Sequence, residues 1–212
     1  MSVVDVKLER LNEVSMRDFS TFGRIVGRDE DTEEGKYPLH PIDVKAAVEM
    51  DILKGYWDLV PYLDGAENRF SMGMLFLKPK PIGEILDWTE VHYETYEYFF
   101  PLGGKEIIFV LAPKAEVPDP EKTRAFIVGP DEGVLLNKGT WHYPPFAVNG
   151  LTPCLMPRYG KLGEVRSDVT EAFGQKWETP IGNRYFKDQL HALKTDYCGE
   201  GFGGEYKVRL VV

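Results

Sequence analysis

Four ionisable side chains lie in two short stretches of the chain. The first stretch, EVHYETYE at 90–97, contains His92, Glu94 and Glu97, and the second ends in GTWH at His142. Imidazole nitrogens and carboxylate oxygens together suit a divalent metal such as Zn, Mn, Fe or Ni with open coordination positions. Histidine also titrates near neutral pH, which suits general acid or base catalysis. We therefore expect His92, Glu94, Glu97 and His142 to share one polar site that binds a divalent metal.

The first stretch is predicted to belong to one strand over 89–100. Because side chains alternate along a strand, His92 and Glu94 are expected to face the same way. Glu97 is one residue out of phase, and it joins that face only if a bend or bulge intervenes between 94 and 97. Glu90 is expected to lie behind the site or at the surface.

The elements that must position these residues are predicted to be mostly strands. The 212 residues include 21 glycines and 15 prolines, which lie throughout the chain. Short apolar runs at intervals of roughly 8–12 residues, with turn residues between them, are typical of an all-β sandwich or barrel. Strands are expected at 3–11, 69–77, 106–111 and 205–212, and the run EIIFVL at 106–111 indicates a strand buried on both faces.

Only short helices are expected. Ser15 and Asp18 have the spacing of a capping box at the start of a short helix, and Gly23 is placed to end it. Apolar residues at i, i+4 and i+7 predict a second helix over 185–193. We expect one domain over 1–212, with a core at about 8–160 and a C-terminal extension at 161–212 packed on the barrel.

Composition narrows the classes of partner. The formal net charge is -9, and an acidic surface repels both nucleic acid and anionic membranes. Two cysteines form no disulfide framework, no run of 18 apolar residues occurs, and the first residues lack the apolar core of a signal peptide. These features predict a cytoplasmic protein that acts on a small molecule and binds neither nucleic acid nor membrane.

The first stretch resembles the first motif of the cupin family, which has the pattern G-x5-H-x-H-x(3,4)-E-x6-G. His92 takes the place of the first histidine, and Glu94 stands where the second usually lies. Glu97 and Gly104 keep the six-residue gap that ends the motif, although two residues rather than three or four separate Glu94 from Glu97.

The second stretch resembles the second cupin motif, G-x5-P-x-G-x2-H-x3-N. Gly133, Gly139 and His142 match its spacing up to the histidine. Asn137 replaces the proline, and Phe146 replaces the final asparagine. The resemblance implies a cupin-type double-stranded β-helix, or jelly-roll, barrel with the site inside it.

Short segments around both motifs are similar to the ureidoglycolate lyase family. They are FSTFG at 19–23, EVH at 90–92, FFPLGG at 99–104, VLAP at 110–113, RAF at 124–126 and GTWHYP at 139–144. The resemblance covers roughly residues 8 to 150. It implies an enzyme, usually a homodimer, that cleaves a carbinolamide-type C–N bond and converts ureidoglycolate to glyoxylate and urea.

That reaction needs a base for the hydroxyl proton and an acid for the departing urea nitrogen. His92 or Glu97 is the candidate base, and His142 is the candidate acid or a metal ligand. A bound metal would polarise the hydroxyl oxygen.

Substrate-binding residues are also expected near the site. Lys105 or Arg124 is placed to hold the substrate carboxylate, an arginine doing so with two parallel hydrogen bonds, and Tyr143 is expected to contact the substrate. Two alternatives stay open: a metal-dependent cupin isomerase or epimerase for a sugar or sugar acid, favoured by the extra carboxylates Glu94 and Glu97, and a non-catalytic ligand-binding cupin.

Overall fold

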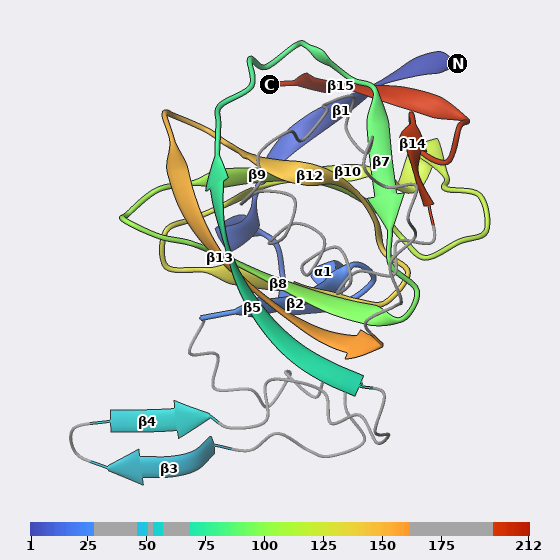
Figure 1. The fold of residues 1–212 in the computed structure, drawn as a ribbon. Coiled ribbons are helices and arrows are strands. Elements are labelled where there is room, and N and C mark those ends of the chain that lie inside the picture. Colours follow the sequence, from blue (N-terminus) through green and yellow to red (C-terminus); the bar gives the residue numbers. More distant parts are fainter. Residues whose placement is uncertain (28–45, 51–52, 57–67, 162–196) are drawn as a thin grey trace, which may run out of the picture.

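The structure is a computed structural model that describes residues 1–27, 46–50, 53–56, 68–161 and 197–212. Strands dominate these residues and form two main sheets (Figure 1). In spatial order, the eight-stranded sheet consists of β14 (Tyr197–Glu200), β7 (Trp88–Val91), β12 (Trp141–Ala147), β9 (Ile107–Ala112), β10 (Arg124–Val128), β1 (Ser2–Arg10), β15 (Tyr206–Val211) and β6 (Ile85–Leu86).

The second main sheet has five strands. In order these are β2 (Gly23–Val26), β11 (Gly133–Leu136), β8 (Thr95–Pro101), β13 (Thr152–Lys161) and β5 (Asn68–Leu77). A separate hairpin pairs β3 (Ala46–Met50) with β4 (Leu53–Tyr56). The described helices are one turn each: η1 (Leu11–Glu13), α1 (Met16–Phe19) and η2 (Pro120–Lys122).

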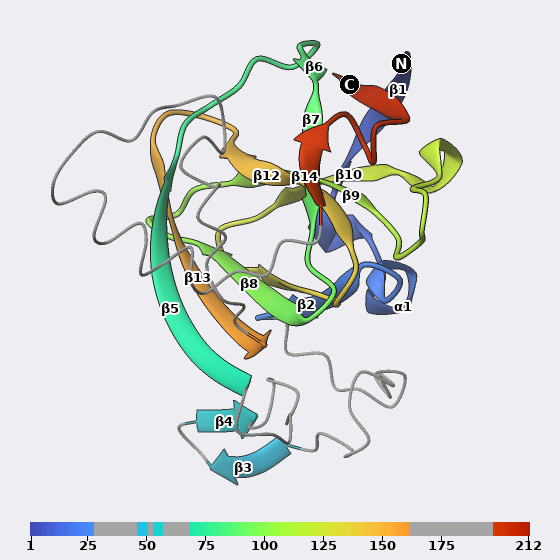
Figure 2. The ribbon, with the colours of Figure 1, turned by 45° about the vertical axis from the view of Figure 1, so that its right-hand side comes forward.

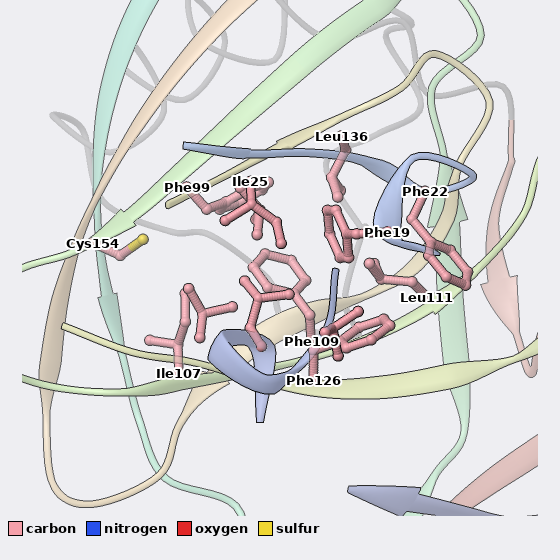
Figure 3. Close-up of a cluster of buried hydrophobic side chains, with 14 of the residues drawn as sticks. Phe19, Phe22, Ile25, Phe99, Ile107, Phe109, Leu111, Phe126, Leu136 and Cys154 are labelled. Atoms are coloured by element: carbon pink, nitrogen blue, oxygen red, sulfur yellow. The ribbon is translucent and has the colours of Figure 1, made fainter. Parts of the chain in front are cut away.

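The two main sheets face each other around one buried cluster, which is the interior of the barrel (Figure 3). Phe99 of the five-stranded sheet meets Phe109 of the eight-stranded sheet edge to face, with ring centroids 4.8 Å apart. The other members come from both sheets and from the N-terminal helical turns, and include Phe19, Phe22, Ile25, Ile107, Leu111, Phe126, Leu136 and Cys154.

The central strand β9 is apolar throughout its length because both of its faces are buried. All six of its residues are buried. Ile107, Phe109 and Leu111 point into the barrel interior, whereas Ile108 and Val110 belong to a second cluster on the other face of the sheet. A strand covered on both faces has no position left for a polar residue.

The N-terminal turn connects the two sheets. Ser15 caps α1, because its hydroxyl oxygen accepts a hydrogen bond of 3.1 Å from the Asp18 amide. Gly23 does not end this helix as expected, but begins strand β2. A Cβ atom there would lie 1.9 Å from the Leu135 carbonyl oxygen, so the close approach of β2 to β11 requires glycine.

The C-terminal strands are integral to the eight-stranded sheet. β15 pairs in parallel with β1, and β14 pairs with β7, which lies beside it in Figure 2. Phe202 and Tyr206, whose rings stack with centroids 5.3 Å apart, fill the second cluster between these strands.

The predicted all-β, cupin-type barrel with a few short helices is confirmed. A second local prediction, besides that for Gly23, is wrong: the single strand over 89–100 is broken into β7 and β8 by a bend at Tyr93 and Glu94. The helix predicted over 185–193 lies outside the described residues, as does most of the predicted 161–212 extension. Among the described residues, no helix is long and apolar enough to cross a membrane.

Candidate functional site

His92 and His142 meet inside the barrel. Both side chains are buried, and their ring centroids lie 5.4 Å apart. His142 is on β12, and His92 follows the last residue of β7. The chain therefore brings together the two histidines that the sequence singled out, from segments 50 positions apart.

Two carboxylates lie beside the two rings. Glu97 Oε2 is 3.4 Å from His92 Nε2 and 3.3 Å from His142 Nε2. On the other carboxylate, Glu90 Oε2 is 3.6 Å from His92 Nε2 and Glu90 Oε1 is 3.4 Å from His142 Nε2. These separations suit charge attraction and are longer than those of the strongest charge-assisted hydrogen bonds. Both Nε2 atoms therefore face the same small volume between two carboxylates.

His142 is held in place by its neighbours on the sheet. It stands directly opposite Glu90 in the β12–β7 ladder, and the Thr89 hydroxyl donates to the His142 carbonyl oxygen. Its Nδ1 lies 3.1 Å from the Thr140 carbonyl oxygen. A carbonyl can only accept, so this contact places a proton on Nδ1 and turns the lone pair of a neutral ring at Nε2 toward the carboxylates.

The bend between β7 and β8 brings Glu97 to the same face as His92. Gly160 on β13 permits this bend to approach, because a Cβ there would lie 2.1 Å from the Glu94 carbonyl oxygen. Gly139 secures the other side, since its amide donates to the His92 carbonyl oxygen at 2.8 Å. The break that sequence reasoning required between 94 and 97 lies just before that interval, at Tyr93 and Glu94.

Burial and charge oppose each other in the site. Burial favours the neutral form of Glu97, but the nearby imidazoles of His92 and His142 outweigh it and lower the pKa of Glu97 to about 2. Burial also favours neutral His142, yet attraction to Glu90 and Glu97 raises the pKa of His142 to about 10. Without a metal, the site therefore holds ionised Glu97 beside a protonated His142.

The donor set fits a divalent metal. Donor atoms of Glu90, His92 and His142 all lie within 4.8 Å of one another, and Glu97 Oε2 is within reach of both rings. The Nε2 atom of His142 is buried and has no hydrogen-bond partner within the described residues. A cation binds neutral imidazole, so it would take the place of the proton on that atom.

The remaining predicted site residues lie elsewhere. Glu94 is half-buried in the bend and, among the described residues, forms no ion pair with either histidine. Lys105 donates from Nζ to the Leu151 carbonyl oxygen at 2.7 Å. Arg124 holds Glu9 with two hydrogen bonds of 2.8 and 2.6 Å, and Tyr143 packs against Trp88 on the face of the sheet away from the barrel interior.

Two residues of the site were not singled out by their spacing. Glu90 joins the cluster because it is the ladder partner of His142. Arg158 on β13 is the ladder partner of Glu97. Alternation was the available signal for Arg158, since Cys154, Met156 and Arg158 share one face of an otherwise apolar strand.

Comparisons with known proteins agree with the arrangement of motifs. The family described as ureidoglycolate lyase matches residues 6–173. Ureidoglycolate lyase from Azotobacter vinelandii is 29% identical over 82 residues, which are 39% of this chain and 49% of that protein. The enzyme of the same name from Pseudomonas syringae pv. syringae is 34% identical over 82 residues, 39% of this chain and 48% of the relative. These matches span about half the length of the curated relatives.

Solved structures give weaker likenesses. An oxalate oxidase in complex with the substrate analogue glycolate is 13% identical, has a TM-score of 0.32, and is matched over 57% of this chain and 63% of that chain. The Streptomyces albus enzyme HEPD, solved with 2-hydroxyethylphosphonate and Fe(II), is 19% identical with a TM-score of 0.33, over 57% of this chain and 24% of that chain. At these scores the fold rests on the sheet topology itself.

Proposed function

We propose, since the chain belongs to the ureidoglycolate lyase family, that it cleaves ureidoglycolate to glyoxylate and urea. The observation that supports this reaction is the meeting of two buried imidazoles with two carboxylates inside the barrel.

In this proposal Glu90, His92 and His142 hold a divalent cation. When bound, such a cation polarises the substrate hydroxyl and lowers its pKa. The contact between His142 Nδ1 and the Thr140 carbonyl oxygen keeps the ring oriented with Nε2 toward the site.

Glu97 moves the proton. Without a metal, its carboxylate is ionised at neutral pH because the neighbouring histidines outweigh burial and lower its pKa. A cation held by those histidines would favour the same ionised form, because it is also a positive charge beside the carboxylate. It accepts the proton of the carbinol hydroxyl as the carbonyl of glyoxylate forms, and the electron pair of the C–N bond passes to the urea nitrogen. The same low pKa makes protonated Glu97 a ready acid, which returns the proton to that nitrogen and releases urea.

The test is release of both products. The protein is incubated with ureidoglycolate, after chelation and again with added Zn, Mn, Fe(II) or Ni, and urea and glyoxylate are measured in parallel. His142→Ala is expected to reduce turnover at least about 100-fold, because it removes a ligand of the cation that polarises the substrate hydroxyl. A melting curve of the variant checks that it folds. No release of urea under any of these metal conditions would exclude ureidoglycolate as the substrate.

A metal-dependent isomerase or epimerase acting on a sugar or sugar acid is the second candidate. Two carboxylates beside two histidines favour it, because proton removal and return at a sugar carbon needs an acid and a base in one site. Exchange of deuterium from solvent into a sugar acid, without urea release from ureidoglycolate, would select this reaction.

A further inference from the structure

Arg158 is a buried cation on the wall of the site. Arg158 lies on β13, and only 4% of its surface is exposed. Cys154 and Met156, four and two positions earlier, point into the barrel interior, so alternation directs Arg158 to the same face. Its ladder partner across the sheet is Glu97, which contacts both histidines.

The guanidinium of Arg158 lacks the paired hydrogen bonds to a carboxylate that other arginines of the described residues form. Its Nε is buried and has no hydrogen-bond partner in the described part of the chain. Two arginines nearer the surface differ in this respect. Arg124 donates two hydrogen bonds to the Glu9 carboxylate, and Arg209 donates two to the Asp5 carboxylate. A buried guanidinium is always charged and has a high cost of desolvation unless it is paired.

The charge of Arg158 is attracted by the carboxylates of the site, but no hydrogen bond to them satisfies its Nε–H group. Glu97 and Glu90 are near enough to attract it electrostatically. Side chains directly opposite on neighbouring strands are well placed to bond, yet none of the described ion pairs within 4.0 Å joins Arg158 to Glu97. Among the described residues, the Nε–H group of Arg158 therefore has no acceptor, and it can donate to a group that enters the site.

We propose that Arg158 binds the carboxylate of the substrate and sets specificity for a small 2-hydroxy carboxylate. A planar guanidinium matches a carboxylate with two parallel hydrogen bonds. It places the negative end of the substrate on β13, opposite Glu97, and leaves the carbinol carbon facing Glu97 and the histidines. This inference rests on the proposed function, and it replaces Lys105 and Arg124 as the expected carboxylate-binding residues.

The test separates carboxylate recognition from catalysis. Glycolate and its uncharged amide, glycolamide, are titrated by calorimetry into the 212-residue protein after it has been loaded with Zn. Wild type is expected to prefer glycolate, and Arg158→Gln to bind glycolate about 10- to 100-fold more weakly, which is the range for loss of hydrogen bonds to a charged group. Glycolamide binding should change little, so the preference for the carboxylate collapses. Arg158→Lys keeps the charge without the paired geometry, and is expected to lose part of the preference.

Arg209→Gln is the matched control, because it removes the same charge from a surface pair with Asp5. It should leave glycolate binding within about twofold of wild type. Melting curves of all variants check folding, and Arg158→Lys provides the readout if Arg158→Gln does not fold. Equal glycolate binding in wild type and the Arg158 variants, or no preference for glycolate in wild type, would overturn the inference. Arginine-dependent glycolate binding without urea release would overturn the proposed lyase reaction and leave the role of Arg158 standing.

Discussion

The amide of Gly139 donates a hydrogen bond of 2.8 Å to the carbonyl oxygen of His92. This bond joins the glycine turn of the second motif to the histidine of the first, across a gap of 47 positions in the chain. Three residues after that glycine, His142 enters the same site. The turn therefore fixes the backbone of one imidazole-bearing residue while it positions the other.

Replacement of Gly139 should disturb the site more than the fold. Its φ of 87° lies where a side chain is strained, so Gly139→Ala is expected to cost about 1–2 kcal/mol of unfolding free energy. The new Cβ would also lie 2.7 Å from the flexible Lys114 side chain. Because the strained turn holds His92, metal affinity should fall as well, which titration with a competing chelator measures.

Gly103→Ala is the matched control for that variant. Gly103 has a φ of 72° and no atom within 4 Å of an added Cβ, and it lies in the turn after β8. It should lose similar stability with no change in metal affinity. Equal loss of metal affinity in both variants would show that the Gly139 effect is a general consequence of reduced stability.

The choice between Glu90 and Glu94 as the carboxylate of the metal site can be decided by a paired substitution. Glu90 is within 3.6 Å of both Nε2 atoms, whereas Glu94 lies in the bend. Changes in residues that only support a metal ligand cost about 10–100-fold in affinity, so loss of a directly bound charge should cost at least tenfold. Glu90→Gln is therefore expected to weaken Zn or Mn binding at least about tenfold, and Glu94→Gln less than twofold. The reverse order would return the site to the arrangement expected from strand alternation.

Local patterns in the sequence were sufficient for most of the barrel. The apolar run at 106–111 predicted a strand buried on both faces, and β9 is one. The Ser15 cap was predicted from its spacing to Asp18 and is present. Both features depend on neighbours in the chain, which is why they are visible without knowledge of the tertiary structure.

The site was harder to predict because it depends on a backbone break and on strand order. Tyr93 and Thr95 are residue types that favour strands, so the local sequence does not predict the bend at Tyr93 and Glu94. Gly160, which permits it, is 66 positions after Glu94. Arg158 became a site residue only when the β13–β8 register placed it opposite Glu97.

The barrel interior should depend on its aromatic contacts. Phe109 is fully buried and lies edge to face on Phe99, so Phe109→Ala is expected to lower the unfolding free energy by about 3–5 kcal/mol. Phe76→Ala is the matched control, because Phe76 is 65% exposed and should change stability by about 0.5 kcal/mol or less. Urea denaturation measures both. A similar loss in the two variants would contradict the placement of Phe109 in the core.

Cys154 provides a pH-dependent test of the same interior. Burial raises the pKa of its thiol to about 12, so the folded protein keeps it neutral where an unfolded chain, with a thiol pKa of 9.0, ionises it. The unfolded state then binds fewer protons, and the free energy of unfolding should fall between pH 9 and 12 by at most about 1.4 kcal/mol per pH unit. Only thiolate reacts with iodoacetamide, so in a Cys198→Ser background native protein at pH 9 should be alkylated far more slowly than the same variant unfolded in urea. Equal rates in the two states would mean that the Cys154 thiol is open to solvent and that the strand face it shares with Arg158 does not point into a closed interior.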